Sequence, residues 1–185
     1  HVFALLLELA NGCGEHAHSV AAGEWSACPD FCYWKRPVVE LRGLRLGILG
    51  FGRIGRRVAE LGHAFGMKIL AATRPAKNRS PYPGRHDVFL GEAHLEGWPI
   101  PVRRVPFERF FAEVDVVSLH CPQTKDNFQF IDRRVLRAMK PGAFLINTAR
   151  GTLINEAALA EALHEGRIGG AALDVLSVEP PPPDH

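Results

Sequence analysis

The chain has 185 residues, of which 46% are hydrophobic and 23% charged, so it is long enough for one domain with a sizeable core. Its formal net charge of +2, from 22 basic and 20 acidic residues, gives no reason to expect a nucleic acid or a membrane as partner. Four cysteines at irregular spacing favour reduced thiols and a cytoplasmic protein. Residues of the types that bind zinc cluster near the start but match no standard zinc spacing, so we expect no metal site: Cys13, His16, His18, Cys28 and Cys32.

The beginning of the chain divides into a helix and an arm. Residues 1–11 form an apolar run without a basic leader, which indicates a core helix rather than a signal peptide. Residues 12–44 are rich in glycine, histidine and aromatic residues, and we expect irregular structure there. We therefore assign residues 1–43 to an N-terminal helix and arm, and residues 44–185 to a regular cofactor-binding domain.

From residue 44 onward, predicted strands alternate with predicted helices. Because the strands are continuous apolar runs, they indicate a parallel sheet that is covered on both faces. The fold class is therefore α/β, a doubly wound parallel sheet of the Rossmann type in three α/β/α layers. Pro101 places the third strand at a sheet edge, and residues 74–100 predict a long surface excursion. The strands are expected at 44–49, 68–72, 100–105, 114–119, 143–147 and 170–175, and the helices at 54–65, 107–113, 132–139 and 155–165.

A glycine-rich turn follows the first of these strands, in the run Gly50-Phe51-Gly52-Arg53-Ile54-Gly55. It opens a helix that leads to a second strand, which is the context that a dinucleotide-binding turn requires. Gly50 permits the tight turn, Gly52 lets a pyrophosphate approach the backbone, and Gly55 lets the helix pack close to the strand. The amides of Arg53 and Ile54 lie at the helix N-terminus, where partial positive charge favours an anion.

The end of the second strand indicates which dinucleotide binds. An acidic residue there would bind the ribose hydroxyls of NAD, but the sequence is Ala72-Thr73-Arg74, with Lys77 and Arg79 just beyond. The missing carboxylate and the nearby cations favour the 2′-phosphate of NADP, with Thr73 and Arg74 as its contacts. The alternative is a solvated basic loop.

Polar residues follow the last two strands at the carboxyl edge, where ligands bind in doubly wound sheets. An arginine at the position of Arg150 can clamp a carboxylate and polarise a neighbouring carbonyl. Asp174 ends the last strand, and Glu179 lies five residues on, where a general-acid relay would be wanted. From spacing alone, two interpretations of Arg150, Asp174 and Glu179 stay open: site residues and ordinary surface residues. Surface or capping roles are expected for His164, Asp115 and Asp132.

Four stretches carry a recognisable pattern, and they cover nearly the whole chain: residues 41–55, 115–122, 139–151, and 165–175 with Glu179-Pro180. Together they resemble the D-isomer-specific 2-hydroxyacid dehydrogenases. Residues 25–37, with Phe31-Cys32-Tyr33-Trp34, are similar to the glycerate dehydrogenase (hydroxypyruvate reductase) branch.

The resemblance implies roles for these residues. Arg150 would bind the substrate carboxylate and carbonyl, Glu179 would hydrogen-bond a catalytic histidine, and Asp174 would hold the nicotinamide carboxamide. Hydride would pass between NAD(P)H and the C2 carbonyl of a small 2-oxo acid such as hydroxypyruvate or glyoxylate. The cofactor cleft would be lined by His120, Cys121, Pro122, Thr148 and Ala149.

Two departures from the family pattern matter. The catalytic histidine of the family lies C-terminal to the glutamate, and His185 aligns too early to be that residue. The substrate half of the family, mostly N-terminal to residue 1, is also missing. We therefore expect this chain to bind dinucleotide but barely to turn substrate over alone. Asn127 stands where the family often has threonine, so it is left out of the site.

In this family the cofactor domain also forms the dimer through its first helix and arm. We expect the aromatic residues of the arm to be exposed, and they therefore predict a homodimer interface, the alternative being a locally packed loop. These residues are Trp25, Phe31, Tyr33 and Trp34.

Two other functions stay open: a phosphoglycerate or formate dehydrogenase-type enzyme, and a non-catalytic NAD(P)H-sensing module like the corepressor of this fold. The presence of Arg150 and Glu179 favours an enzyme.

Overall fold

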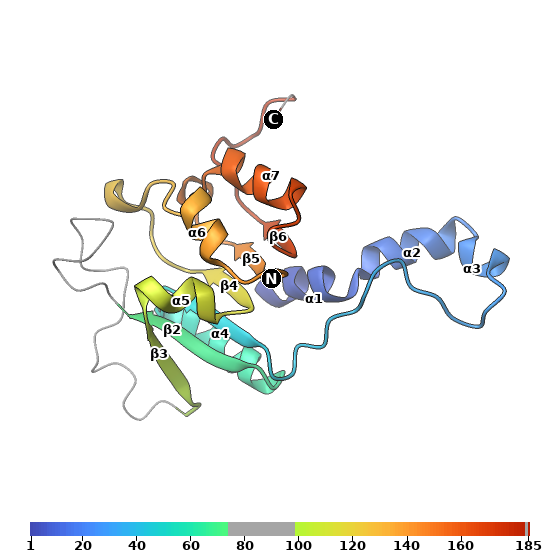
Figure 1. Ribbon diagram of the computed structural model, residues 1–185, viewed down its shortest axis with the longest axis horizontal. Coiled ribbons are helices and arrows are strands. Elements are labelled where there is room, and N and C mark those ends of the chain that lie inside the picture. The colour runs from blue at the N-terminus through green and yellow to red at the C-terminus, as the bar shows by residue number, and fades with distance from the viewer. Residues whose placement is uncertain (74–98, 184) are drawn as a thin grey trace.

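A computed structural model of the chain describes residues 1–73, 99–183 and 185. In this described part, a six-stranded sheet has the order β3-β2-β1-β4-β5-β6, and every pairing is parallel (Figure 1). This is the order of a doubly wound dinucleotide-binding sheet, whose switch point lies between β1 and β4, and it confirms the predicted fold class. The strands are β1 (Arg45–Leu49), β2 (Lys68–Thr73), β3 (Val102–Pro106), β4 (Val116–Leu119), β5 (Phe144–Asn147) and β6 (Gly170–Leu173).

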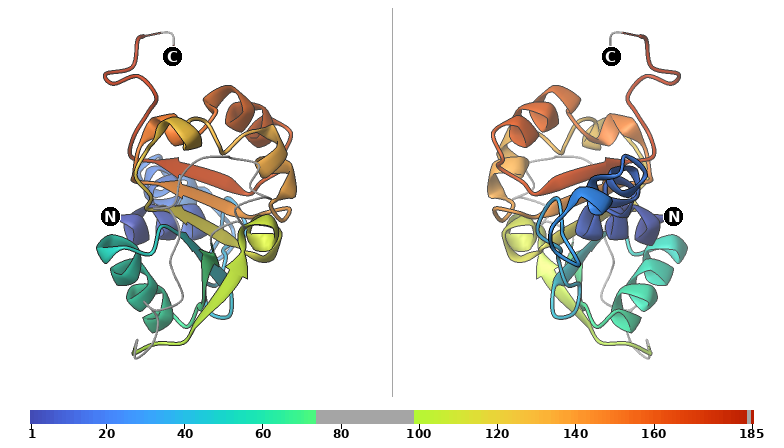
Figure 2. Two further views of the ribbon diagram at one scale, coloured as in Figure 1. Left: turned by 90° about the vertical axis from the view of Figure 1, so that its left-hand side faces the viewer. Right: turned by 90° about the vertical axis from the view of Figure 1, so that its right-hand side faces the viewer.

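Helices cover both faces of the sheet, as Figure 2 shows in two side views. On one face, α1 (Val2–Asn11) and α4 (Arg53–Ala64) bury one hydrophobic cluster against the sheet. On the other face, α5 (Phe107–Glu113), α6 (Arg133–Ala138) and α7 (Glu156–His164) bury a second cluster. The two clusters make the predicted three layers, and all four residues of β4 and of β5 are buried between them.

Local signals in the sequence set most of these boundaries. Gly66, with a φ of +76°, follows the C-terminus of α4. Asn155 caps α7 by accepting a hydrogen bond from the amide of Ala158 at 2.9 Å. Asp132 caps α6 in the same way, which confirms its expected structural role. β3 lies at one edge of the sheet, as Pro101 predicts.

The prediction of irregular structure over residues 12–44 is wrong for its first half. Cys13–Ala21 forms α2 and Glu24–Ala27 forms α3, whereas residues 28–44 contain no helix or strand. Gly12, with a φ of +61°, ends α1 and precedes α2, and the Glu8 carboxylate accepts hydrogen bonds from the Gly14 amide at 3.1–3.2 Å. A cap supplied by the preceding helix leaves no local signal, so the sequence pattern misses α2.

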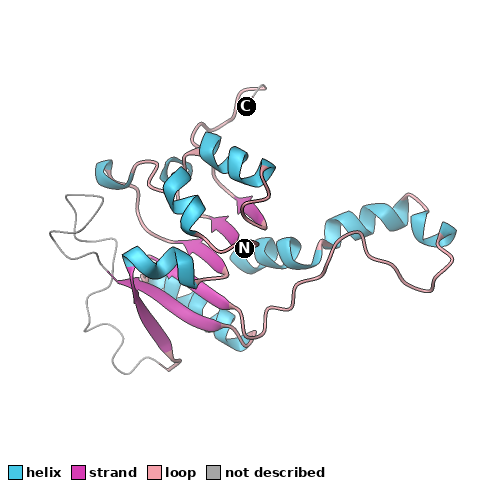
Figure 3. Cartoon of the chain, in the orientation of Figure 1, coloured by secondary structure: helices cyan, strands magenta, loops and turns pink. Residues whose placement is uncertain are grey.

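The helices α2 and α3 extend away from the sheet, and the chain returns alongside them to β1 (Figures 1 and 3). Polar contacts hold this arm together. The Ser19 hydroxyl donates to Glu24 at 2.9 Å and lies 2.8 Å from the Tyr33 hydroxyl, and Arg36 donates to the carbonyl of Glu8 at 2.5 Å. Tyr33 is therefore partly buried within the arm, and the prediction that it is exposed is wrong.

Some predictions fall on residues 74–98 and thus outside the described residues. These are the surface excursion and the cations Arg74, Lys77 and Arg79. Within the described ranges, none of the helices combines the length and the apolar character needed to cross a membrane.

Candidate functional site

The turn between β1 and α4 is shaped by two glycines that tolerate no side chain. Gly50 has a φ of +94°, and a Cβ there would lie 2.6 Å from the amide nitrogen of Cys121. A Cβ on Gly55 would lie 2.2 Å from the carbonyl oxygen of Gly50. Gly50 therefore provides the tight turn and Gly55 the close packing of α4, as the sequence predicts.

Gly52 has a different environment, because outside Gly52 and its two chain neighbours no atom of the described chain lies within 4 Å of the position of its Cβ. No side chain of the described residues caps α4, which begins at Arg53, and the Ile54 side chain is exposed. The helix N-terminus thus presents its amides to open space, with its partial positive charge. A shallow depression at this point is lined by Gly52, Arg53, Arg56, Arg57 and Glu60. The open space at Gly52 and the amide donors at the start of α4 fit a pyrophosphate.

The loop after β4 packs against this turn. The His120 amide donates to the carbonyl of Leu49 at 2.7 Å, and the peptide between His120 and Cys121 contacts Gly50. The His120 Nε2 lies 2.8 Å from the Ser118 Oγ, and burial lowers the pKa of His120 to about 4. Burial also raises the pKa of Cys121 to about 12. At neutral pH the imidazole is therefore uncharged and the thiol protonated, so Cys121 is a packing residue rather than a nucleophile.

Asn127 shapes the same loop, although the sequence analysis leaves it out of the site. Its Nδ2 donates to the carbonyl of Pro122 at 2.8 Å, and its Oδ1 accepts from the amide of Thr124 at 2.7 Å. Asn127 ends the short helix η2 (Lys125–Asn127) and is buried. A side chain that binds two backbone groups in this way fixes the loop after Pro122, a role that the family pattern did not indicate.

The loop after β5 is organised by Asn147, which is fully buried. Its Oδ1 accepts from the amide of Ala149 at 3.0 Å, and its Nδ2 donates to the carbonyl of Arg150 at 2.9 Å. Thr148 and Ala149 are partly buried, whereas the Arg150 side chain is exposed and donates to the Ala149 carbonyl at 2.6 Å. The structure thus presents the Arg150 guanidinium on the surface at the carboxyl edge of the sheet.

The loop after β6 reaches the same edge. The Asp174 amide donates to the Asn147 carbonyl at 3.0 Å, and its exposed carboxylate lies 3.0 Å from the His1 Nε2. Glu179 is also exposed, and its Oε1 accepts from the amide of Leu176 at 2.8 Å. Arg150, Asp174 and Glu179 therefore share the β5–β6 part of the carboxyl edge, while the glycine turn occupies the β1–β4 part. Thr73 ends β2 at this edge.

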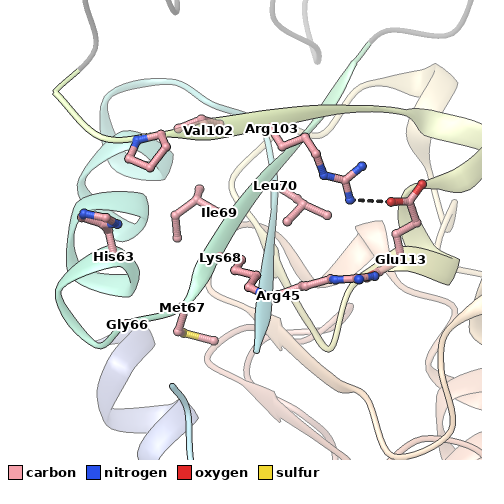
Figure 4. Close-up of a pocket in the computed structure, with 11 residues that line it drawn as sticks. Arg45, His63, Gly66, Met67, Lys68, Ile69, Leu70, Val102, Arg103 and Glu113 are labelled. Carbon is pink, nitrogen blue, oxygen red and sulfur yellow. Dashed lines mark hydrogen bonds and ion pairs between the residues drawn. The ribbon is translucent and has the colours of Figure 1, made fainter. Parts of the chain in front are cut away.

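A larger cavity, of about 820 Å³, lies at the opposite edge, near the amino ends of β1, β2 and β3 (Figure 4). Met67, Ile69, Leu70 and Val102 line it, and an ion pair between Arg103 and Glu113 crosses one side. It contains none of the predicted site residues that the structure describes. The candidate site is therefore the carboxyl edge, where chemistry in doubly wound sheets takes place.

No group of three or more histidine, cysteine, aspartate or glutamate side chains within the described ranges is placed to hold a metal ion. All four cysteines are free thiols, and Cys13 and Cys32 are exposed.

Comparison with known proteins identifies the family. The family model described as "D-isomer specific 2-hydroxyacid dehydrogenase, NAD binding domain" matches residues 3–185. The chain belongs to the D-isomer specific 2-hydroxyacid dehydrogenases. The resemblance seen in the sequence is thereby confirmed, and the sheet with its glycine turn is the NAD-binding domain of this family.

Individual members of the family agree with this assignment. A glycerate dehydrogenase of Methylorubrum extorquens is 38% identical over 181 residues, covering 98% of this chain and 50% of that protein. A glyoxylate reductase of Thermococcus litoralis is 41% identical over 182 residues, covering 96% of this chain and 49% of that protein. The crystal structure of a glyoxylate reductase from Paecilomyes thermophila matches with a TM-score of 0.78 at 30% identity, covering 97% of this chain and 48% of that one. The chain thus spans about half the length of the curated relatives it matches.

Proposed function

We propose that this dehydrogenase domain is the cofactor-binding part of an enzyme that transfers a hydride between NAD(P)H and the C2 carbonyl of a small 2-oxo acid. Hydroxypyruvate and glyoxylate are the proposed substrates, and relatives named glycerate dehydrogenase and glyoxylate reductase support that class. The observation that carries the proposal is the placement of Arg150 on the same sheet edge as the open turn at Gly52. This reaction needs a carboxylate-binding cation and a pyrophosphate site on the same edge of the sheet.

The β1–β4 part of the edge would hold the cofactor's phosphates. The amides of Arg53 and Ile54 would donate to the pyrophosphate in front of Gly52, since nothing in the described chain fills that space. The backbone of His120, Cys121 and Pro122 would line the cleft beside it, together with Thr148 and Ala149. A bound nicotinamide supplies or accepts the hydride.

The β5–β6 part of the edge would orient the reacting groups. The Arg150 guanidinium would pair with the substrate carboxylate in bidentate fashion and polarise the adjacent carbonyl. Asp174 would accept a hydrogen bond from the nicotinamide carboxamide. The Glu179 carboxylate would orient the imidazole that exchanges a proton with the substrate oxygen.

We also propose a preference for NADP. β2 ends at Thr73, and the sequence continues with Arg74, Lys77 and Arg79 and no acidic residue at the expected position. A carboxylate would repel a 2′-phosphate, whereas guanidinium groups bind it.

We further propose that residues 1–43 make a homodimer, and that the protein works in the cytoplasm. Three aromatic side chains of the arm are exposed by 51% at Trp25, 90% at Phe31 and 67% at Trp34, which is unusual for a surface without a partner. Four free thiols favour a reducing compartment. Light scattering at micromolar concentration tests the dimer, and a monomer there would contradict it.

Steady-state reduction of hydroxypyruvate and glyoxylate by the protein that carries this chain tests the proposed activity. Replacing the exposed guanidinium in Arg150→Gln should lower kcat/KM by about 10²–10³-fold, the usual size of a lost transition-state donor. Arg134→Gln, an exposed arginine on α6, is the matched control and should keep the wild-type rate. An active wild type whose Arg150→Gln variant is equally active would contradict the proposal.

A further inference from the structure

Glu156, the first residue of α7, has no part in the roles proposed above, yet its carboxylate binds the loop that carries Glu179. The Oε1 of Glu156 accepts from the Ser177 amide at 2.6 Å, and its Oε2 accepts from the Ser177 hydroxyl at 2.5 Å. The His185 Nε2 lies 3.4 Å from the same Oε2. Hydrogen bonds to a charged carboxylate are stronger than those between neutral groups. Here both oxygens of the Glu156 carboxylate accept hydrogen bonds from Ser177.

Gly151 anchors the same loop from another direction. A Cβ on Gly151 would lie 1.9 Å from the carbonyl carbon of Leu176 and 2.0 Å from its oxygen. The backbone of Leu176 and Ser177 therefore rests directly on the turn after β5, where η3 (Gly151–Leu153) begins. The loop is thus fixed by a backbone contact at Gly151 and by the Glu156 carboxylate.

These anchors lead directly to Asp174, proposed for the nicotinamide, and to Glu179, proposed for the catalytic imidazole. Leu176, which rests on Gly151 and adjoins Ser177, donates its amide to the Glu179 carboxylate at 2.8 Å. At the start of the loop, Asp174 is tied to β5 by its amide bond to the Asn147 carbonyl. Holding Ser177 therefore holds the segment between Asp174 and Glu179.

We propose that Glu156 is a positioning residue for the nicotinamide half of the cofactor site. Its carboxylate keeps residues 174–179 in the conformation that presents Asp174 and Glu179 at the sheet edge. The inference rests on the proposed function. Without the carboxylate, two donors of Ser177 lose their acceptor and the loop gains freedom that binding must then remove. The pyrophosphate half does not share this effect, because backbone contacts between Gly50, Gly55 and Cys121 form it.

Calorimetric titration of ligands with and without a nicotinamide separates the two halves of the site. The pairs are NADH with ADP-ribose, and NADPH with 2′-phospho-ADP-ribose. The wild-type chain should bind the dinucleotide more tightly than the matching ribose compound. In Glu156→Ala, the dinucleotide affinity should fall about tenfold, because binding must then order the loop, while the affinity for the matching ADP-ribose stays unchanged.

Matched variants exclude a general loss of structure. Glu161→Ala changes a glutamate of the same helix that pairs with Arg133, and it should leave both affinities unchanged. Ser177→Ala removes only the hydroxyl donor and should reduce the dinucleotide affinity less than Glu156→Ala does. Amide exchange at Ser177 should be faster in Glu156→Ala than in the wild type.

The outcomes distinguish this inference from the proposed function. A wild-type chain that binds neither member of either pair contradicts the proposed function itself. A wild type that binds, with a Glu156→Ala variant of equal dinucleotide affinity, overturns only the positioning role. An equal loss of affinity for both members of a pair in Glu156→Ala and Ser177→Ala also overturns it, because the effect is then not specific to the nicotinamide.

Discussion

The two halves of the carboxyl edge are built in different ways. In the β1–β4 half, the backbone makes the site. Gly50 allows the tight turn, Gly55 allows α4 to pack close to it, and the Cys121 amide lies against the turn. In the β5–β6 half, side chains make it: Asn147 ties two backbone groups and Glu156 ties Ser177. The first half therefore depends on the absence of side chains, and the second on particular polar side chains in addition to the backbone contact at Gly151. A substitution in one half should therefore impair that half and leave the other half intact.

The largest effect is expected at Gly55, in the half made by the backbone. A Cβ in Gly55→Ala would lie 2.2 Å from a backbone oxygen that cannot move without displacing the turn. We expect a loss of about 3 kcal/mol in the free energy of unfolding, the upper range for overpacking. Urea denaturation measures it. Gly52→Ala is the control, because its φ of −74° suits alanine and its Cβ would meet open space. A Gly55→Ala variant as stable as the control would contradict this packing.

A second glycine probes the other half. Gly151→Ala places a Cβ 1.9 Å from Leu176, but that contact is to a partly exposed surface loop that can move away. We expect a smaller cost of about 2 kcal/mol, together with weaker dinucleotide binding at unchanged ADP-ribose binding. Urea denaturation and the paired titrations measure the two effects. Loss of ADP-ribose binding in Gly151→Ala would show that the halves are not separate.

Asn147 tests how far polar side chains hold the β5–β6 half. Asn147→Ala removes a buried side chain and leaves the Ala149 amide and the Arg150 carbonyl without their partner in a partly buried loop, at a cost of about 2 kcal/mol. The comparison variant is Asn127→Ala, which also frees two backbone groups but in the loop after β4. Chemical denaturation should show a loss of stability in both variants. Only Asn147→Ala should also impair the binding of the substrate carboxylate by Arg150. Unchanged stability in Asn147→Ala would refute the role.

His120, at the junction of the two halves, predicts a pH dependence. Its pKa in the folded chain is about 4, below the ordinary value of 6.5, because burial disfavours the charged form. The unfolded chain then binds more protons between these pH values. The stability that His120 contributes is therefore complete above pH 6.5 and is lost as the pH falls toward 4.

The expected loss over that range is on the order of 2 kcal/mol, less than the full shift because the side chain is only partly buried. Denaturation at pH 7, 5.5 and 4.5 measures it, and His120→Gln should flatten the profile. His63→Gln, at an exposed histidine of α4, should keep the wild-type profile. Identical profiles for wild type and His120→Gln would contradict the assignment.

The contrast between the halves also explains what the sequence can predict. The glycine turn and the positions of the strands follow from local signals, because a turn, a helix start and an apolar run are each encoded by neighbouring residues. The bond from Glu156 to Ser177 joins residues 21 apart in the sequence and leaves no periodic trace. Asn127 was left out for a different reason, because the family often has threonine at its position. Its contacts are local: the side chain takes part in a capping box at Thr124 and binds the Pro122 carbonyl.

The arm shows the same limit in the fold. The helix α2 contains few apolar residues, and its start is capped by Glu8 from the preceding helix. Contacts of Ser19 with Tyr33 then connect α2 to the returning chain. Such support comes from tertiary structure, so the segment looked irregular in sequence. The apolar pattern of α1, by contrast, placed that helix within one residue at each end.

The central claim is that a dinucleotide binds in the open space in front of Gly52. Calorimetric titration of NADPH and NADH into the wild-type chain and into Gly52→Ala tests it most directly. We predict that the wild type binds both, NADPH more tightly. Gly52→Ala should keep its stability but lose about tenfold or more in affinity for each, as expected when charge-assisted bonds to the phosphates are disturbed. A Gly52→Ala variant that binds as the wild type does, or a wild type that binds neither, would contradict it.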